Sequence, residues 1–322
     1  MPPSAHAEAP SKYEREPPNS ASPQGLVSAQ KNPLRNSLPL LPFGAHGLRR
    51  EHRQITTHIP TSMNSPSLLT RQEILQSLRQ RLQPLPYVHA MWEAGAIAFD
   101  RVDQWSDIDL QFDVDDDRVE EAFAEVERAL ASLSAIEIRL RLPDPTWHGH
   151  SQAFYRIANA SPFLMIDLSI SRHSQTAARE AFLRQDIHGV PVVHFDKSGV
   201  VKPASFNAEE HRQSLLARLP QMRQNFILFQ PLVLKELNRG NVIEAVAFYH
   251  SWLVRPLVEL LRIRHCPQRH NFHTRYIQHD LPAEIGARLE RFFYVANADE
   301  IRQRREEGEE WFLELVEEMS KR

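Results

Sequence analysis

Apolar side chains recur with helical and strand periods from about residue 70 onward. Residues 70–82 place apolar positions three and four apart, which predicts a helix that ends before Pro84. Residues 88–98 form a short apolar run that contains Gly95, which indicates a buried strand followed by a tight turn. Residues 108–114 alternate acidic and apolar side chains, and this alternation predicts a second strand.

Helix and strand patterns continue to alternate as far as about residue 200. Asp117, with Glu120 three residues later, predicts the capped start of a helix whose apolar face runs to Leu133. Apolar and charged residues alternate over 136–142, which is typical of a half-buried strand. Two strand patterns around a turn-forming Asn-Ala-Ser-Pro segment predict a hairpin, and one short strand follows it. These three strands are expected at 153–158, 163–170 and 190–195.

After about residue 205 the pattern is helical. Long apolar-rich stretches occupy 215–237 and 242–263, and the second is apolar almost all round, which predicts a buried central helix. Asn241 and Asn297 each precede a Glu by three residues, so we expect each to cap a helix. Pro256 predicts a kink within the second stretch.

Residues 1–62 show neither period and hold ten of the 23 prolines. Such a segment buries too little apolar surface to offset the entropy of ordering it, so we expect a disordered, Pro-rich tail. Helical patterning begins just after Met63, which is therefore a candidate start of the native protein. The rest is predicted to form an α+β domain at 64–200, with a short mixed sheet flanked by helices, and an all-helical domain at 205–322.

Composition excludes several classes of protein. Hydrophobic residues make up 42% and charged residues 25%, as in ordinary soluble globular proteins. The net charge of −3 disfavours a generally basic nucleic-acid binder. The single cysteine, Cys266, excludes an intrachain disulfide framework and a cysteine-rich zinc module. No run approaches the roughly 18 apolar residues of a membrane-spanning helix and no secretory signal is recognisable, so we expect a cytoplasmic protein without a membrane partner.

Three acidic residues carry the strongest chemical signal. Asp107 and Asp109 are two apart in a predicted strand, so their carboxylates are expected on the same side. Converging carboxylates repel each other unless a cation lies between them, and hard oxygen donors suit Mg²⁺ or Mn²⁺. Asp167 interrupts an otherwise apolar predicted strand, where an unpaired charge would be costly. We therefore predict a metal site formed by these three carboxylates, with Gly95 allowing backbone to approach a phosphate closely.

Several other polar groups have a simpler interpretation. His148 and His150 lie in a Pro-rich loop and are interpreted as solvated side chains, although the loop, with Trp147, could border a pocket. Lys235 and Arg262 are candidate cations for phosphate binding from the helical domain, because the three acids all come from the first domain. Basic residues on helices are usually solvated, so the acids remain the better signal.

The pattern of glycine and acids resembles the nucleotidyltransferase superfamily related to DNA polymerase beta. Its motif is met by Ala94-Gly95, by Asp107-Ile108-Asp109 about a dozen residues later, and by Asp167 on a later strand. The sequence Ser-Asp-Ile-Asp-Leu at 106–110 is most similar to the motif of the aminoglycoside and minimal bacterial nucleotidyltransferases. The segment at 275–282 resembles the helical C-terminal domain of small bacterial members.

This resemblance implies catalysis by the three acids with Mg²⁺ or Mn²⁺ as cofactor. It also implies that Gly95, Ala96 and Ser106 line the phosphate side, and we add Lys235 as a phosphate-binding cation. Ala96 departs from the family pattern, in which Ser or Gly is common, so a side-chain hydroxyl for the terminal phosphate is missing.

The implied reaction moves a nucleoside monophosphate from an NTP, ATP by default, to an acceptor hydroxyl and releases pyrophosphate. The active site is expected in a cleft between the two domains. The acceptor is unidentified, with a small molecule favoured over a macromolecule, and base preference and oligomeric state stay open. One alternative is a nucleotidyltransferase that acts on protein or RNA. The other is a catalytically weak nucleotide-binding regulatory module, which Ala96 favours and the three carboxylates oppose.

Overall fold

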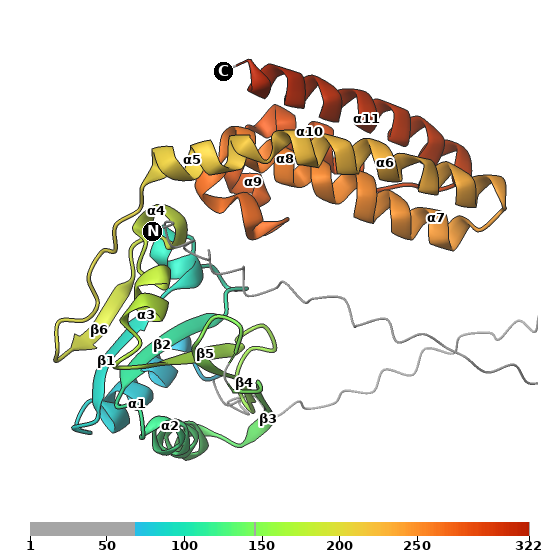
Figure 1. Ribbon diagram of the computed structural model, residues 1–322. Coiled ribbons are helices and arrows are strands. Elements are labelled where there is room, and N and C mark those ends of the chain that lie inside the picture. The colour runs from blue at the N-terminus through green and yellow to red at the C-terminus, as the bar shows by residue number, and fades with distance from the viewer. Residues whose placement is uncertain (1–67, 145, 322) are drawn as a thin grey trace, which may run out of the picture. The chain divides into compact units, whose positions relative to one another are not determined.

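A mixed six-stranded sheet organises the first part of the described chain (Figure 1). The computed structural model describes residues 68–144 and 146–321, so the predicted tail at 1–62 and Met63 lie outside the described residues. The elements of this part are α1 (Arg71–Leu82), β1 (Val88–Glu93), the 3₁₀ helix η1 (Gly95–Phe99), β2 (Ile108–Val114), α2 (Val119–Leu133), β3 (Ile136–Arg141), β4 (Ser151–Ile157), β5 (Ile166–Arg172), α3 (Thr176–Phe182), α4 (Gln185–His188) and β6 (Val192–Asp196).

The strand order is β3-β4-β5-β2-β1-β6. The central β2–β5 pair is parallel, and every other neighbouring pair in this sheet is antiparallel. The predicted hairpin is therefore the β4–β5 pair. The prediction of a short mixed sheet flanked by helices and followed by a helical region is confirmed.

The two faces of β2 differ in chemistry because its sequence alternates. Ile108, Leu110 and Phe112 are at most 1% exposed and pack with residues of α1 and α2 in one hydrophobic cluster. Asp109 and Gln111 point to the opposite face, since side chains alternate along a strand. In Figure 1, α1 and α2 lie on one side of the sheet and α3 on the other. Polar side chains at the sheet centre therefore lie on the side of the sheet that faces α3.

Two details of the first part differ from the sequence prediction. The strand β3 is at the sheet edge, and Ile138 and Leu140 are 48% and 54% exposed, so the half-buried interpretation is wrong. Asp117 does not cap α2: the helix begins after Arg118, whose side chain makes no cap hydrogen bond. The first error arises because a periodic pattern predicts a strand but not what packs against it, and the second is a shift of the helix start by one residue.

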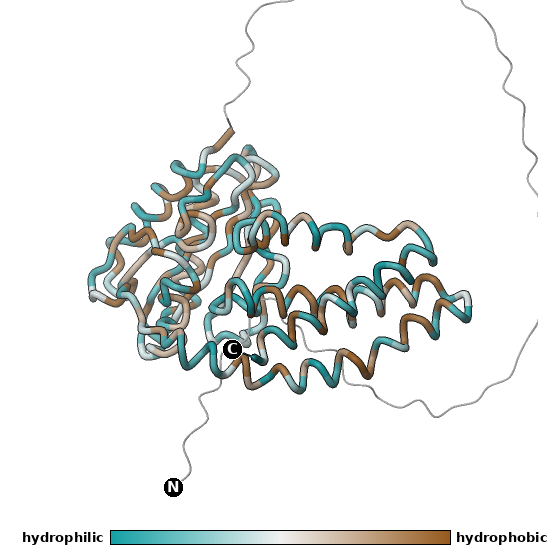
Figure 2. Tube along the Cα trace, turned by 90° about the horizontal axis from the view of Figure 1, so that it is seen from above, coloured by the Kyte–Doolittle hydropathy of each residue, from teal (hydrophilic) through white to brown (hydrophobic). Residues whose placement is uncertain are grey.

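The second part is helical. Its elements are α5 (Ala208–Ala217), α6 (Leu219–Asn238), α7 (Val242–Tyr249), the π-helical turn η2 (His250–Val254), α8 (Arg255–His265), the 3₁₀ helix η3 (Pro267–Phe272), α9 (Ile277–Asp280), α10 (Ala283–Glu290) and α11 (Ala298–Ser320). Apolar and polar positions alternate along the helical turns in Figure 2, as expected where each helix buries one face. No helix among the described residues combines the length and apolar character of a membrane span.

The helical part has its own hydrophobic cluster, in which Leu253, Leu257 and Leu261 are fully buried. The π-helical turn η2 lies directly before Pro256, where the sequence predicted a kink. Asn297 caps α11 as predicted, whereas the side chain of Asn241 donates to Glu236 instead of capping α7. Residues 68–321 belong to one compact unit, and the domain boundaries at 64–200 and 205–322 stay predictions.

A buried ion-pair network holds the segment that follows α8. Arg262 is fully buried and donates to Asp280 at 2.9 Å and to backbone carbonyls, so the suggestion that it reaches a phosphate is wrong. Arg269 donates to the other oxygen of Asp280 at 2.6 Å. Burial alone would raise the pKa of Asp280, but the hydrogen bonds from both arginines outweigh it and hold that pKa below its ordinary value.

Replacing Asp280 by Asn leaves two buried or half-buried guanidinium groups without their counter-charge. The free energy of unfolding should fall by about 3–5 kcal/mol in urea denaturation. In the wild type, the contribution of ionised Asp280 to the free energy of unfolding should be complete above the unfolded-state pKa of about 3.9. It should disappear as the pH falls through the lower folded-state pKa. Glu317→Gln is the matched control, because its ion pair with Lys321 is exposed and should change stability by less than about 1 kcal/mol. Equal effects of the two substitutions would contradict the role of this network.

Candidate active site

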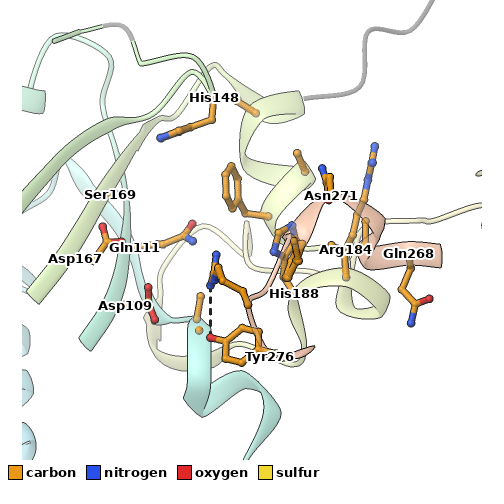
Figure 3. A pocket seen from close by; sticks show the side chains of 18 of the residues that line it. Asp109, Gln111, His148, Asp167, Ser169, Arg184, His188, Gln268, Asn271 and Tyr276 are labelled. Atoms are coloured by element: carbon orange, nitrogen blue, oxygen red, sulfur yellow. Dashed lines mark hydrogen bonds between the residues drawn. The ribbon is translucent and has the colours of Figure 1, made fainter. Parts of the chain in front are cut away.

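Asp109 and Asp167 are direct neighbours across the parallel β2–β5 pair. Their Cα atoms are register partners, and adjacent strands lie about 4.8 Å apart. Both side chains point to the α3 side of the sheet, and both line the same cavity. Two residues distant in sequence thus present adjacent carboxylates at one point, and Figure 3 shows both acids on the same cavity wall.

The side chain of Asp109 packs directly against the backbone of Gly95. Its φ of +69° lies in the region that glycine adopts without strain, and η1 begins at this residue. A Cβ atom at this position would lie 1.7 Å from Oδ2 of Asp109, which no side chain can tolerate. The backbone of Asp109 is also fixed, because its carbonyl accepts from the amide of Ala94 at 2.9 Å. The absence of a side chain at Gly95 therefore leaves room for the Asp109 carboxylate, and the close approach of this backbone to a phosphate stays a prediction.

Four other residues were predicted to belong to the site, and the structure places them as follows. Asp107 is half-buried and lies one residue before β2, so it shares the side of Asp109, but it is not among the residues that line the cavity. Ala96 lies within η1, and the hydroxyl of Ser106 closes a turn with Asp103 at 2.9 Å. The ammonium of Lys235 lies 3.8 Å from the Glu236 carboxylate and is not part of the cavity lining. The roles proposed for these four residues stay predictions.

Arg71 and Glu93 were not identified from sequence, although they support the site. The Arg71 guanidinium donates to the backbone carbonyl of Asp107 and to the carboxylate of Glu93. Glu93 is 3% exposed and also pairs with His194 at 2.9 Å. This bridge ties the residue before β2 to the end of β1. A buried acid in an apolar run is the same kind of signal that singled out Asp167, so Glu93 was detectable.

A hydrogen-bond chain of three buried residues ends on Asp167. Gln152 donates from Nε2 to Oδ1 of Asp167 at 2.5 Å. Its own oxygen lies 3.1 Å from Nε2 of His148, and an amide oxygen only accepts, so His148 is the donor there. The backbone amide of His150 donates to Nδ1 of His148 at 3.4 Å, which fits the same neutral form of the ring. We call these three side chains, His148, Gln152 and Asp167, the relay.

The relay corrects the expectation for the Pro-rich loop. His148 and His150 are 6% and 1% exposed, so they are not solvated. Burial lowers the pKa of His150 to about 3, and that imidazole is therefore uncharged near neutral pH. Trp147 does border the cavity, as the sequence suggested. The error arose because the loop packs under α3, with the His150 ring 4.8 Å from the ring of Phe182.

The cavity around Asp109 and Asp167 has a volume of about 490 Å³, which lies within the usual range for small-molecule sites. Its floor is the polar sheet face, where Gln111 and Ser169 continue the line of the two acids. Its other walls come from α3 and α4 and from the η3 region of the helical part (Figure 3). The cavity is therefore lined by residues of both predicted domains.

A second polar cluster lies at the other end of β2. Ligand atoms of His89, Asp113 and His173 all lie within 4.8 Å of one another. Asp113 is fully buried and already pairs with Arg179 and His173, each at 2.5 Å. The two ring nitrogen atoms of His89 form hydrogen bonds with Asp115 and Ser198. These hydrogen bonds account for the cluster, and we assign no metal to it.

This chain matches no protein-family model and no curated protein. Among solved structures, it is similar to an aminoglycoside 6-adenyltransferase from Bacillus subtilis, with 12% identity, a TM-score of 0.34, and coverage of 78% of this chain and 89% of that one. It is also similar to spectinomycin adenyltransferase AAD(9) from Enterococcus faecialis, determined with ATP and spectinomycin. There the identity is 9%, the TM-score is 0.29, and the coverage is 77% and 97%. Because the TM-scores are low, the functional argument rests on the site of this chain itself.

Proposed function

We propose that this protein is a metal-dependent nucleotidyltransferase. The single observation that carries the proposal is the register of Asp109 with Asp167, which brings two carboxylates together at a cavity. Two or three hard oxygen donors at one point fit Mg²⁺ or Mn²⁺, which take few protein carboxylates and complete their coordination with water and phosphate oxygens. Asp107, Asp109 and Asp167 are the residues that would hold the metal.

The proposed reaction transfers a nucleoside monophosphate from an NTP, by default ATP, to a hydroxyl group of a small acceptor. A bound divalent cation supplies charge stabilisation at the phosphate oxygens. Asp167 takes the proton of the attacking hydroxyl, whose oxygen forms the new bond to the α-phosphorus as the bond to pyrophosphate breaks. The relay holds Oδ1 of Asp167 in a fixed hydrogen bond. Backbone groups near Gly95 and Ala96 would line the phosphate side.

Calorimetry with ATP tests this proposal against the alternative of a regulatory nucleotide-binding module. Binding of ATP should require Mg²⁺ and should be accompanied by pyrophosphate release when an acceptor is present. We would measure ATP binding with and without Mg²⁺, and then pyrophosphate across a panel of nucleotides and hydroxyl acceptors. Equal ATP affinity without the metal, together with no pyrophosphate from any pair, would favour the regulatory module. Transfer to protein or RNA alone would favour the macromolecular alternative.

The relay gives a prediction of its own. Gln152→Leu removes the donor to Asp167 while keeping a side chain of similar size, so the carboxylate loses its orientation. Affinity for Mn²⁺, measured by electron paramagnetic resonance titration, should fall by about 10–100-fold, the range found for residues that orient metal ligands. Gln221→Leu, at an exposed position on α6, is the matched control and should not change it. An unchanged Mn²⁺ affinity in Gln152→Leu would exclude the relay as a positioning device.

A further inference from the structure

The charges of the cavity wall are unevenly distributed. Among the described residues that line the cavity, the carboxylates are Asp109 and Asp167, which the proposed function assigns to the metal. The other formal charges of this lining are the guanidinium groups of Arg184 and Arg275. A bound ammonium group would lose its water here without gaining an anionic partner, which is strongly unfavourable in a confined site. The wall is therefore unsuited to a polycation.

A row of ring-bearing side chains forms another part of the wall. The ring of Phe182 stacks on that of His188 at 5.3 Å, and the ring of His188 lies 5.9 Å from that of Phe272. At the other end of this row, His148 lies 5.6 Å from Phe182 and 4.9 Å from Trp147. All five residues line the cavity. This aromatic row is longer than one nucleobase can cover, so it offers contact area beyond that needed for the donor nucleotide.

Gln111 adds a directional group to the floor. Its side chain is 8% exposed, and its Oε1 atom has no hydrogen-bond partner among the described residues. Figure 3 shows the amide directed toward the cavity, on the same strand face as Asp109. An unpaired buried acceptor is costly, and a ligand O–H or N–H group would satisfy it. Gln111 lies two residues from Asp109, or about 7 Å along the strand.

We propose that the acceptor is a flat, aromatic hydroxyl compound that is uncharged or anionic, and not a polycationic sugar. The aromatic row contacts its ring, and Oε1 of Gln111 accepts a hydrogen bond from a donor group about 7 Å from the reacting hydroxyl. This inference rests on the proposed function, because it takes Asp109 and Asp167 to be occupied by metal. It separates this chain from the acceptors named for the two adenyltransferases to which it is similar.

A series of phenols that differ only in charge tests the proposal. The probes are tyramine, tyrosol and 4-hydroxyphenylacetate, which are cationic, neutral and anionic, together with kanamycin as a polycation. Binding to the full chain is measured by saturation-transfer difference NMR with Mg²⁺ and a non-hydrolysable ATP analogue. Tyrosol and 4-hydroxyphenylacetate should bind at least ~10-fold more tightly than tyramine, a difference of about 1.4 kcal/mol. Kanamycin should bind more weakly than every phenol.

Two substitutions locate the binding. Phe182→Leu and Gln111→Leu should each weaken tyrosol binding at least ~5-fold, which is about 1 kcal/mol. Phe163→Leu is the matched control, since that ring is 53% exposed and is not part of the cavity lining. Tightest binding of tyramine or kanamycin would overturn the proposal. So would the absence of phenol binding, an unchanged affinity in Phe182→Leu, or displacement of tyrosol by the ATP analogue.

A further arm distinguishes failure of this inference from failure of the proposed function. The phenol series is repeated with Asp109→Asn, without nucleotide or Mg²⁺. If tyrosol still binds there and Phe182→Leu still weakens that binding, while Mg²⁺–ATP never binds the wild type, the aromatic site stands and the nucleotidyltransferase proposal falls. If Mg²⁺–ATP binds but no phenol preference is found in either protein, the function stands and the acceptor class is wrong.

Discussion

Replacing Asp109 by Asn should lower the rate of nucleotidyl transfer by at least ~10²-fold, since stabilisation by a bound metal is worth several kcal/mol. The substitution keeps the shape that rests on Gly95 but removes one negative charge. Because the neighbouring carboxylate of Asp167 then has less repulsion to overcome, the melting temperature without metal should stay the same or rise. The increase in melting temperature that Mg²⁺–ATP gives the wild type should disappear.

Steady-state pyrophosphate assays and thermal melts, each with and without Mg²⁺–ATP, check both halves of this expectation. Asp117→Asn is the control, because Asp117 is 85% exposed and lies outside the cavity lining. Its activity and its response to Mg²⁺–ATP should match the wild type. An Asp109→Asn protein with nearly full activity, or a wild type whose melting temperature ignores Mg²⁺–ATP, would refute the proposed site.

Gly95→Ala should be the most damaging single-methyl change in the cavity. The added Cβ would lie 1.7 Å from Oδ2 and 2.5 Å from Cγ of Asp109, so either η1 or the carboxylate must move. We expect loss of Mn²⁺ binding and of activity, with a drop in unfolding free energy larger than the about 1–2 kcal/mol of the left-handed backbone alone.

The chain offers a closely matched control for this substitution. Gly240 has a φ of +78°, similar to that of Gly95, but a Cβ there would meet nothing within 4 Å. Gly240→Ala therefore carries the backbone strain without the clash. The difference between the two variants in chemical denaturation and in Mn²⁺ titration measures the contact with Asp109. If both variants behave alike, Gly95 matters only for its backbone conformation.

Local patterns in the sequence predicted elements well where the cause is local. Residues close together in the sequence determine the helix at 70–82, the acidic–apolar strand at 108–114 and the cap at Asn297. The closeness of Asp109 and Asp167 was predictable from the Asp-Ile-Asp motif downstream of Gly95 together with Asp167, an acid in an apolar strand. The parallel pairing that brings them together was not, since it depends on which strands become neighbours.

The supporting residues of the site escaped prediction for a related reason. Gln152 carries no periodic signal, and its importance comes from the β4–β5 pairing, which places it beside Asp167. His148 was interpreted as solvated because it lies in a Pro-rich loop, yet it is buried and its ring packs against Phe182 of α3. Asp117 failed as a cap because Arg118 takes that position. For Gln152 and His148 a tertiary neighbour decided the outcome, whereas for Asp117 the helix begins one residue later than predicted.

The parallel pairing of β2 with β5 also has a consequence for how the protein folds. These two strands are separated in sequence by α2, β3 and β4, so their contact closes a long loop and forms only after much of the chain has been ordered. A slip of one residue would turn either acid into the hydrophobic cluster on the other face. The site therefore forms only once β2 and β5 have paired in the correct register. Divalent cations should stabilise the finished sheet without accelerating the steps that precede it.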